Sequence, residues 1–433
     1  GFCCSMRCTG EDAGTEDAIG YGKGFTDCRA AGCGEAESIT AARRRAFEAV
    51  FSCRWISIAA RRGRTGSGGI SPEIQEKRGK RMSVHKKMRR VVSLDLIRTV
   101  AALMVVMIHC SSPFVKSFET ASREFVLGNI FDGISRAAVP LFVMTSGALL
   151  LDERREFSVK KFYGKNVKNL VLLLVFWSAF YAVLYQVIFP LARGEAADVP
   201  ELIHDFVFGH YHMWYLYMAV GLYLITPFLR CVAVKENAGL VRLFLGISLA
   251  AQFTVPLTQA LTAVWEPLES WDNLLGKFRL QFFCGFTAYY LAGWYLTHVG
   301  LSRRGKRILA ACGIFSLALI FVYVQLTGKY SIGYSNYSLL VFLYSAALFQ
   351  GLYRLGERIQ GRRTGSLLAA CAGLSFGVYI LHPLLLTELR KAVPYEGTPL
   401  LYLLGTFVTA CAGAAVLTRT GSAIPGIRKL FRM

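Results

Sequence analysis

The chain has 433 residues, of which 54% are hydrophobic and 18% are charged, and its formal net charge at pH 7 is +21. Apolar runs of roughly 20 residues recur from residue 93 to the end of the chain, and a soluble fold cannot bury so many of them. Basic residues alternate with these runs, which is typical of membrane proteins and disfavours a nucleic-acid partner. We therefore expect the lipid bilayer, and no nucleic acid, to surround most of the chain.

Residues 1–81 are interpreted as a non-native or disordered extension ahead of a membrane domain of residues 82–433. They show no sustained hydrophobic period, and their irregularly spaced cysteines lack the paired spacing of a zinc site. Natural translation is expected to begin at Met82 or Met88, just before the first membrane segment. A short basic amphipathic helix over residues 41–64, lying on a membrane surface, is the alternative to disorder.

Ten apolar segments long enough to cross a bilayer follow one another, so the predicted fold class is all-α, a polytopic bundle of transmembrane helices. The predicted spans are residues 92–112, 134–151, 169–190, 212–230, 239–257, 279–299, 306–326, 334–354, 367–387 and 399–418.

The loops between these spans alternate in charge. One set is rich in Lys and Arg, whereas the loops around residues 195–205 and 266–272 are acidic or mixed. Because Lys and Arg collect on the cytoplasmic side of membrane proteins, both ends of the chain are predicted to lie in the cytoplasm. Residues 419–433 are too few for a folded domain, so a stand-alone membrane form is expected.

The first span, SLDLIRTVAALMVVMIHC, carries three ionisable residues: Asp95, Arg98 and His109. At about 100° per residue, the step from Arg98 to His109 is three turns plus roughly 20°, so the two side chains share one helix face. Asp95 lies three residues before Arg98 and is able to pair with it. Ionisable residues are expensive inside a membrane and mark functional sites by default. The alternative is an ion pair at the membrane entrance with a histidine that only packs.

Other polar residues sit in or beside later spans. His382 precedes Pro383 in the ninth span, Ser146 and Gly147 lie in the second, and a cluster marks the outer end of the fourth. That cluster comprises His210, His212, Trp214, Tyr215 and Tyr217. An aromatic belt explains the rings of the fourth span, and small residues in the second span favour close helix packing. No third ligand accompanies His210 and His212, so no metal site is expected.

Four segments in order resemble the acyltransferase 3 family of bacterial integral-membrane acyltransferases, from about Val92 to the end. They are LDLIRTVAALMVVMIHC, VPLFVMTSGALLL, HMWYLYMAVGLYLITPFL and FGVYILHP. Each motif is weak alone, but their order on a chain of ten predicted spans is fairly specific. The resemblance implies transfer of an acyl group, most often acetyl, from cytoplasmic acyl-coenzyme A to a carbohydrate hydroxyl at the outer face of the bacterial inner membrane.

The resemblance implies that Arg98 and His109 are the pair required for activity and that Asp95 is a supporting residue. Two departures are visible. Many members have arginines after the second span, where this chain has Lys161, Lys165 and Lys168, and an aromatic position usually held by Phe is Tyr215. Lysine supplies charge for phosphates but no bidentate fork.

The residues suit this chemistry. Neutral histidine is a fitting base for a hydroxyl proton near neutral pH, so His109 is predicted to be the general base; an acyl-histidine route stays open. Arg98 and the three lysines are predicted to bind the phosphates of the donor, and no permanently bound cofactor is expected. Candidate residues around the substrate are Ser146, His212, Trp214, Tyr217 and His382.

Several alternatives remain open at this level. A transporter or exporter of polysaccharide or lipid-linked sugar would also use many spans and intramembrane charges. The sequence is compatible with a free or a lipid-linked acceptor, with an acetyl or a succinyl donor, and with any oligomeric state.

Overall fold

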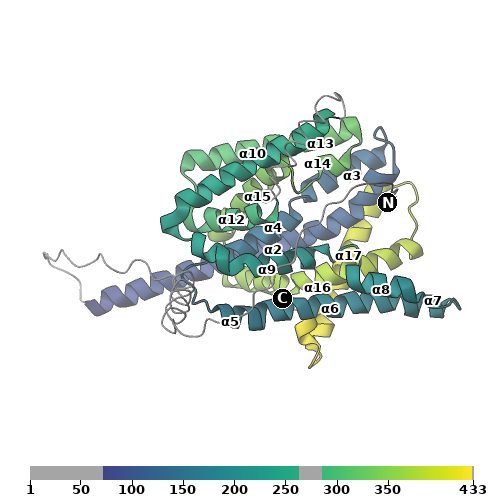
Figure 1. Cartoon of the computed structure of the whole chain (residues 1–433), viewed down its shortest axis with the longest axis horizontal. Helices are drawn as coiled ribbons and strands as arrows, with labels where there is room; N and C mark the ends of the chain where they lie inside the picture. The colour runs from purple at the N-terminus through teal and green to yellow at the C-terminus, as the bar shows by residue number, and fades with distance from the viewer. Residues whose placement is uncertain (1–71, 263–284, 432–433) are drawn as a thin grey trace, which may run out of the picture. The chain divides into compact units, whose positions relative to one another are not determined.

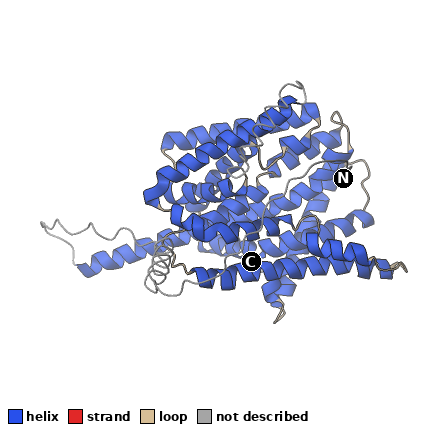
Figure 2. Ribbon diagram, in the orientation of Figure 1, coloured by secondary structure: helices blue, strands red, loops and turns tan. Residues whose placement is uncertain are grey.

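The computed structural model describes residues 72–262 and 285–431, all of which belong to one compact unit, Ser67–Met433. Every regular element in this described part is a helix, as Figure 1 and Figure 2 show. The predicted all-α fold class is therefore confirmed. The division predicted at residues 81 and 82 falls inside the first helix, and residues 1–71 lie outside the described residues, so that division stays a prediction.

Eight helices of the described part are long and apolar enough to cross a membrane. They are Val92–Ser117, Arg123–Leu150, Val159–Ala192, Trp214–Val232, Arg303–Thr327, Leu339–Arg358, Arg362–Ala392 and Pro399–Ala423. Each coincides with one of the ten predicted spans. The fifth prediction, 239–257, lies within α10 (Ala238–Thr262), and the sixth, 279–299, ends in α12 (Phe286–Trp294) and η6 (Tyr295–Val299), with 279–284 outside the described residues. The side of each terminus stays a prediction.

The central helix of the bundle is α2 (Pro72–Ser117), which carries all three ionisable residues of the first predicted span. Its apolar residues recur every three or four positions, as in Leu94, Ile97, Ala101 and Val105, and all four are buried. The helix contacts five others: α3 (Arg123–Ser135), α4 (Ala138–Leu150), α15 (Leu339–Arg358), α16 (Arg362–Ala392) and α17 (Pro399–Ala423). Side chains on α2 therefore face other helices over much of its surface.

The second span begins at Arg123, eleven positions before the predicted start at residue 134. The predicted span contains Arg136 but leaves Asp132 outside. In the structure these two side chains form an ion pair of 2.6 Å, and Asp132 is only 1% exposed. The Arg136 guanidinium also lies 4.3 Å from the ring centre of Tyr334. Pairing lowers the cost of both charges, so α3 is able to lie within the bundle.

The third span is a single long helix whose hydrogen-bond pattern changes along its length. It comprises α5 (Val159–Lys161), η1 (Phe162–Val167), α6 (Lys168–Val183), η2 (Leu184–Ile188) and α7 (Phe189–Ala192). The chain then turns back, and α8 (Val199–Phe208) packs against α6. Gly209 ends α8 with a φ of +73°, a conformation that glycine adopts without strain. The tight turn that follows carries His210 and His212 into α9 (Trp214–Val232).

The remaining helices complete the bundle. η3 (Lys235–Asn237) leads into α10, and α13 (Arg303–Thr327) packs along α15, with the short α14 (Tyr330–Gly333) between them in the chain. α16 packs against α17, and η7 (Arg428–Phe431) follows.

Two glycines bring α4 and α12 into backbone contact. A Cβ added to Gly147 would lie 1.9 Å from the carbonyl oxygen of Tyr290, and one added to Gly293 would lie 1.9 Å from that of Met144. Only a residue without a side chain fits at either position, which is the usual way for membrane helices to approach closely. The motif Ser146-Gly147 is therefore explained in part by packing, and this crossing fixes the position of Ser146.

We expect Gly147→Ala to lower the free energy of unfolding by about 1–3 kcal/mol, because one methyl group must push two backbones apart. Thermal unfolding of the purified protein in detergent measures the loss. The matched control is Gly221→Ala in α9, where nothing lies within 4 Å of an added Cβ. Equal midpoints for the two variants would contradict the close crossing.

Candidate functional site

A cavity of about 320 Å³ lies between α2, α4, α9 and α16. Its lining residues come from all four helices: Asp95, Arg98, Phe142, Ser146, Tyr215, Tyr223, Ala369, Ala372, Gly373, Ser375, Phe376 and Tyr379. Three of the predicted site residues, Asp95, Arg98 and Ser146, are thus brought together in one place. A cavity of this kind, mostly apolar with a few converging polar groups, is the usual form of a small-molecule site.

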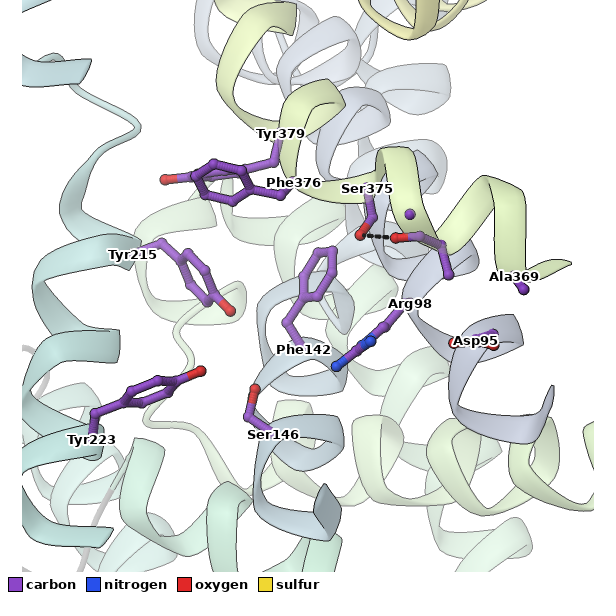
Figure 3. Close-up of a pocket in the computed structure, with 12 residues that line it drawn as sticks. Asp95, Arg98, Phe142, Ser146, Tyr215, Tyr223, Ala369, Ser375, Phe376 and Tyr379 are labelled. Carbon is purple, nitrogen blue, oxygen red and sulfur yellow. Dashed lines mark hydrogen bonds between the residues drawn. The ribbon is translucent and has the colours of Figure 1, made fainter. Parts of the chain in front are cut away.

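The polar groups of the cavity converge on one space, as Figure 3 shows. The hydroxyl groups of Tyr215, Tyr223 and Ser146 and the guanidinium of Arg98 all point into it. Asp95 lies close enough for the charge of Arg98 to act on it. The cavity therefore offers a cation and three hydroxyl groups to a polar ligand, and the rings of Phe142 and Phe376 also line it.

Tyr379 stands at the boundary between this cavity and a group of histidines. Its Oη donates a hydrogen bond of 2.6 Å to the main-chain oxygen of His212. Its ring centre lies 5.3 Å from that of Tyr215 on the cavity side and 6.4 Å from that of His382 on the other. A single buried side chain therefore contacts both regions.

Four histidines form this second region, which we call the histidine cluster: His109, His210, His212 and His382. The ring centres of His109 and His382 lie 5.1 Å apart, and those of His382 and His212 lie 6.1 Å apart. His210 and His212 share a hydrogen bond of 2.9 Å between their Nδ1 atoms. The structure thus joins residues from α2, α16 and the turn after α8, far apart in the sequence.

Aromatic rings hold the outer members of the histidine cluster in place. The ring of His210 stacks against Tyr181 and Tyr185, with centres 4.7 and 5.2 Å away. The ring of Tyr211 meets His109 edge-on at 5.3 Å while the residue remains 55% exposed. Tyr211 therefore links the surface of the molecule to His109.

Arg98 and His109 sit in different regions although they lie on one helix. Arg98 lines the cavity and His109 belongs to the histidine cluster, eleven residues further along α2. That separation corresponds to about 16 Å along the helix axis, at 1.5 Å per residue. On α16 the cavity-lining residues end at Tyr379, one helical turn before His382. The cavity and the histidine cluster are therefore neighbours along the bundle.

The remaining predicted site residues lie elsewhere. Lys161, Lys165 and Lys168 are exposed on one face of the helix that begins with α5, and they do not line the cavity. Trp214 and Tyr217 are 43% and 39% exposed, and the Tyr217 Oη donates to the main-chain oxygen of Val207. Tyr217 therefore ties α9 to the end of α8.

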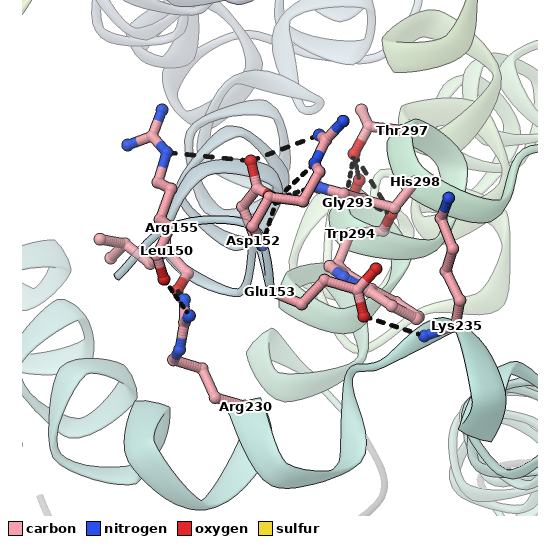
Figure 4. A network of polar contacts seen from close by, with 11 residues as sticks. Leu150, Asp152, Glu153, Arg155, Arg230, Lys235, Gly293, Trp294, Thr297 and His298 are labelled. Carbon is pink, nitrogen blue, oxygen red and sulfur yellow. Dashed lines mark hydrogen bonds and ion pairs between the residues drawn. The ribbon is translucent and has the colours of Figure 1, made fainter. Parts of the chain in front are cut away.

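A polar network ties the ends of α4 and α9 to η6, as Figure 4 shows. Asp152 accepts from Arg154 at 3.0 Å, and its carboxylate lies 3.3 Å from Nε2 of His298. Arg230 on α9 donates to the main-chain oxygens of Leu150 and Arg155 at 2.5 and 3.0 Å. This network holds together the ends of three elements, two of which, α4 and α9, line the cavity.

Sequence reasoning missed Tyr223 and Tyr379 of the cavity and the ion pair of the second span, and it named Tyr215 without placing it among the site residues. Tyr379 stands three residues before His382 in FGVYILHP, so its position in the motif was an available signal. Tyr223 and Tyr215 were indistinguishable from an aromatic belt, because composition does not say which face of α9 meets other helices. Asp132 and Arg136 are spaced i, i+4, which was a usable signal for a helical ion pair.

Among the residues that the structure describes, Glu201, His204 and Asp205 are the group whose potential metal ligands converge. All three lie on α8, two of them are exposed, and none lines the cavity. Exposed acidic groups often lie this close together without a metal, so we do not propose a metal site here. His210 and His212 use their Nδ1 atoms to bond one another. The donor side chains at the cavity are a guanidinium and hydroxyls, which suit an anionic or polar organic ligand.

A family model described as an acyltransferase domain matches residues 91–419 of the chain. The matched region contains the cavity, the histidine cluster and the polar network. No curated protein and no solved structure matched the chain.

Burial lowers the pKa of His210 to about 4, although Asp205 acts in the opposite direction. The unfolded chain, with a histidine pKa near 6.5, binds a proton first as the pH falls. We therefore expect stability to be full above pH 6.5 and to decline by about 1–3 kcal/mol towards pH 4 through this group. Thermal unfolding at stepped pH should show a smaller decline for His210→Gln than for the wild type.

The control for that comparison is His204→Gln, because His204 is an exposed histidine on α8. This variant shows how much of any change comes from replacing a histidine at the surface. A decline in His210→Gln as steep as in the wild type would contradict the burial argument.

Proposed function

The chain belongs to the acyltransferase 3 family of membrane acyltransferases, and we propose that it moves an acetyl group from cytoplasmic acetyl-coenzyme A to a hydroxyl of a carbohydrate acceptor. The transfer would take place across the inner membrane of a bacterium, with the acceptor, free or lipid-linked, at the outer face. The observation that carries this proposal is the arrangement along α2. A cation-bearing cavity and a histidine cluster lie one after the other on the same helix.

The donor end of the proposal rests on Arg98. A coenzyme A thioester carries phosphates at one end and the reactive carbonyl at the end of a long arm. Its binding site therefore needs a cation for the phosphates and a channel for the arm. Arg98 supplies a cation inside the cavity. Lys161, Lys165 and Lys168 are exposed on the helix that begins with α5 and do not line the cavity, and they are proposed to bind the phosphates of the donor outside it. That helix adjoins the cavity wall, because Phe162 packs 5.7 Å from Tyr223.

The chemistry is proposed to take place at His109. Its imidazole takes the proton of the acceptor hydroxyl while the oxygen attacks the thioester carbonyl. The bond between the carbonyl carbon and sulfur then breaks, and the proton passes from His109 to the departing thiolate. Neutral histidine suits both steps because its reference pKa lies near the working pH. Arg98 is proposed to hold the donor so that its carbonyl reaches past Tyr379 to His109.

The acceptor end rests on the surface beside the histidine cluster. Tyr211 is half exposed there and touches His109. The preceding loop, residues 193–198, and α8 bear the acidic residues that the charge rule assigns to the outer side. An acceptor arriving from outside would thus meet His109 from the side opposite to the cavity.

The direct test measures release of free coenzyme A from acetyl-coenzyme A in nanodiscs, with and without candidate acceptor sugars. We expect acceptor-dependent release by the wild type. We also expect a loss of about 10²-fold or more in kcat for His109→Ala, because a general base contributes at least that factor. Arg98→Ala should chiefly raise the KM for the donor, because it removes the cation of the cavity.

Matched controls are His204→Ala and Arg304→Ala, which remove an exposed histidine and an exposed arginine elsewhere. Both should keep wild-type rates. Equal release by the wild type and His109→Ala would remove His109 from the mechanism. Movement of a sugar across proteoliposomes without any thioester donor, and without coenzyme A release, would instead favour a transporter.

A further inference from the structure

His382 is bonded on one side of its ring only. Its Nδ1 lies 3.1 Å from the main-chain oxygen of Val378, one helical turn earlier on α16. A carbonyl oxygen only accepts hydrogen bonds, so Nδ1 carries the hydrogen of this bond, and the neutral ring has its lone pair on Nε2. That Nε2 is buried without a hydrogen-bond partner in the described part of the chain, in a residue that is 0% exposed.

A buried acceptor without a partner is costly and calls for an explanation. The closest ring is that of His109, with centres 5.1 Å apart and planes tilted by 37°. His212 is further away at 6.1 Å; its Nδ1 bonds His210, and its own Nε2 is also buried without a partner in the described part of the chain, so distance is what favours His109 over it. The hydroxyl of Tyr379 is already bonded to the main-chain oxygen of His212. His109 is therefore the neighbour best placed to donate to His382.

The same helix also holds the main chain of His109. Arg390, two turns beyond His382 on α16, donates from Nη2 to the main-chain oxygen of His109. α16 is itself fixed at this level, because the Tyr181 Oη donates to the main-chain oxygen of Ile380 at 2.5 Å. α16 thus contacts both the main chain and the ring of His109, which is what the orientation of a base requires.

We propose that His382 is a positioning residue for His109. A hydrogen bond between the two rings is not made at the ring orientations of the structure, where the rings are only in contact. A turn of the His109 ring that directs one of its N–H groups at Nε2 of His382 would form it, and would leave the other ring nitrogen without a hydrogen and free to receive the proton of the acceptor hydroxyl. This inference rests on the proposed function, because it gives His109 the role of base. A partner that fixes the tautomer of a histidine and stabilises its protonated form is a recurring element of such sites.

The test compares two amide variants that separate the two nitrogens of His382. In His382→Asn the amide reaches the position of Nδ1 and keeps the bond to Val378, but nothing reaches Nε2. In His382→Gln the amide oxygen lies as many bonds from Cα as Nε2 does and remains able to accept from His109. We expect kcat for acetyl transfer to fall about 10²-fold in the Asn variant and to stay within about tenfold of the wild type in the Gln variant.

Comparison of His382→Met with His382→Gln separates loss of the acceptor from misfolding. His382→Met fills the same length without a strong acceptor, so it should resemble Asn in kcat while its KM for acetyl-coenzyme A and its unfolding midpoint stay close to those of the Gln variant. A packing role predicts that Met and Gln are equal.

The outcomes distinguish this inference from the function on which it rests. Acetyl transfer by the wild type with equal kcat for Gln, Asn and Met overturns the positioning role and leaves the proposed function intact. Loss of activity to the same extent in Gln and Met overturns it as well, because an acceptor at Nε2 then makes no difference. A wild type that transfers no acyl group from any donor overturns both.

Discussion

The cost of a guanidinium among apolar helices is the constraint on which the rest of the structure depends. Arg98 lies on α2, which packs against five other helices, so polar groups inside the bundle have to stabilise its charge. Asp95 and the hydroxyls of Ser146, Tyr215 and Tyr223 surround the cavity that it faces. A space lined in this way is open to a polar ligand, and the same features that make Arg98 tolerable make it useful.

Two further contacts connect that cavity to the histidines. The glycine crossing of α4 and α12 fixes Ser146, because Gly147 allows no side chain against Tyr290. Tyr379 touches Tyr215 in the cavity wall and bonds the main chain of His212 in the histidine cluster. A displacement of Tyr379 would therefore change contacts in both the cavity and the histidine cluster. α16 carries Tyr379 and His382 one turn apart, which explains why one motif contributes to both.

Much of this architecture follows from the sequence, because lipid imposes strict rules on length and charge. The spans follow from the length of the apolar runs, and the shared face of Arg98 and His109 follows from helix geometry. The early start of the second span was missed because the i, i+4 spacing of Asp132 and Arg136 was not interpreted as a helical ion pair. The contact between the rings of His109 and His382 could not be predicted either, since the order of helices along the chain does not specify which helices are neighbours.

The cavity lined by Arg98 and the ring of His109 are proposed to form the two ends of one binding path for acetyl-coenzyme A. The most direct measurement is a cryo-electron microscopy structure with an acetyl-coenzyme A analogue whose thioester is replaced by a stable thioether. The account predicts density for the arm in the cavity beside Arg98 and Tyr215, with the acyl end passing Tyr379 to reach His109. An analogue bound elsewhere, or one whose acyl end points away from His109, would contradict it.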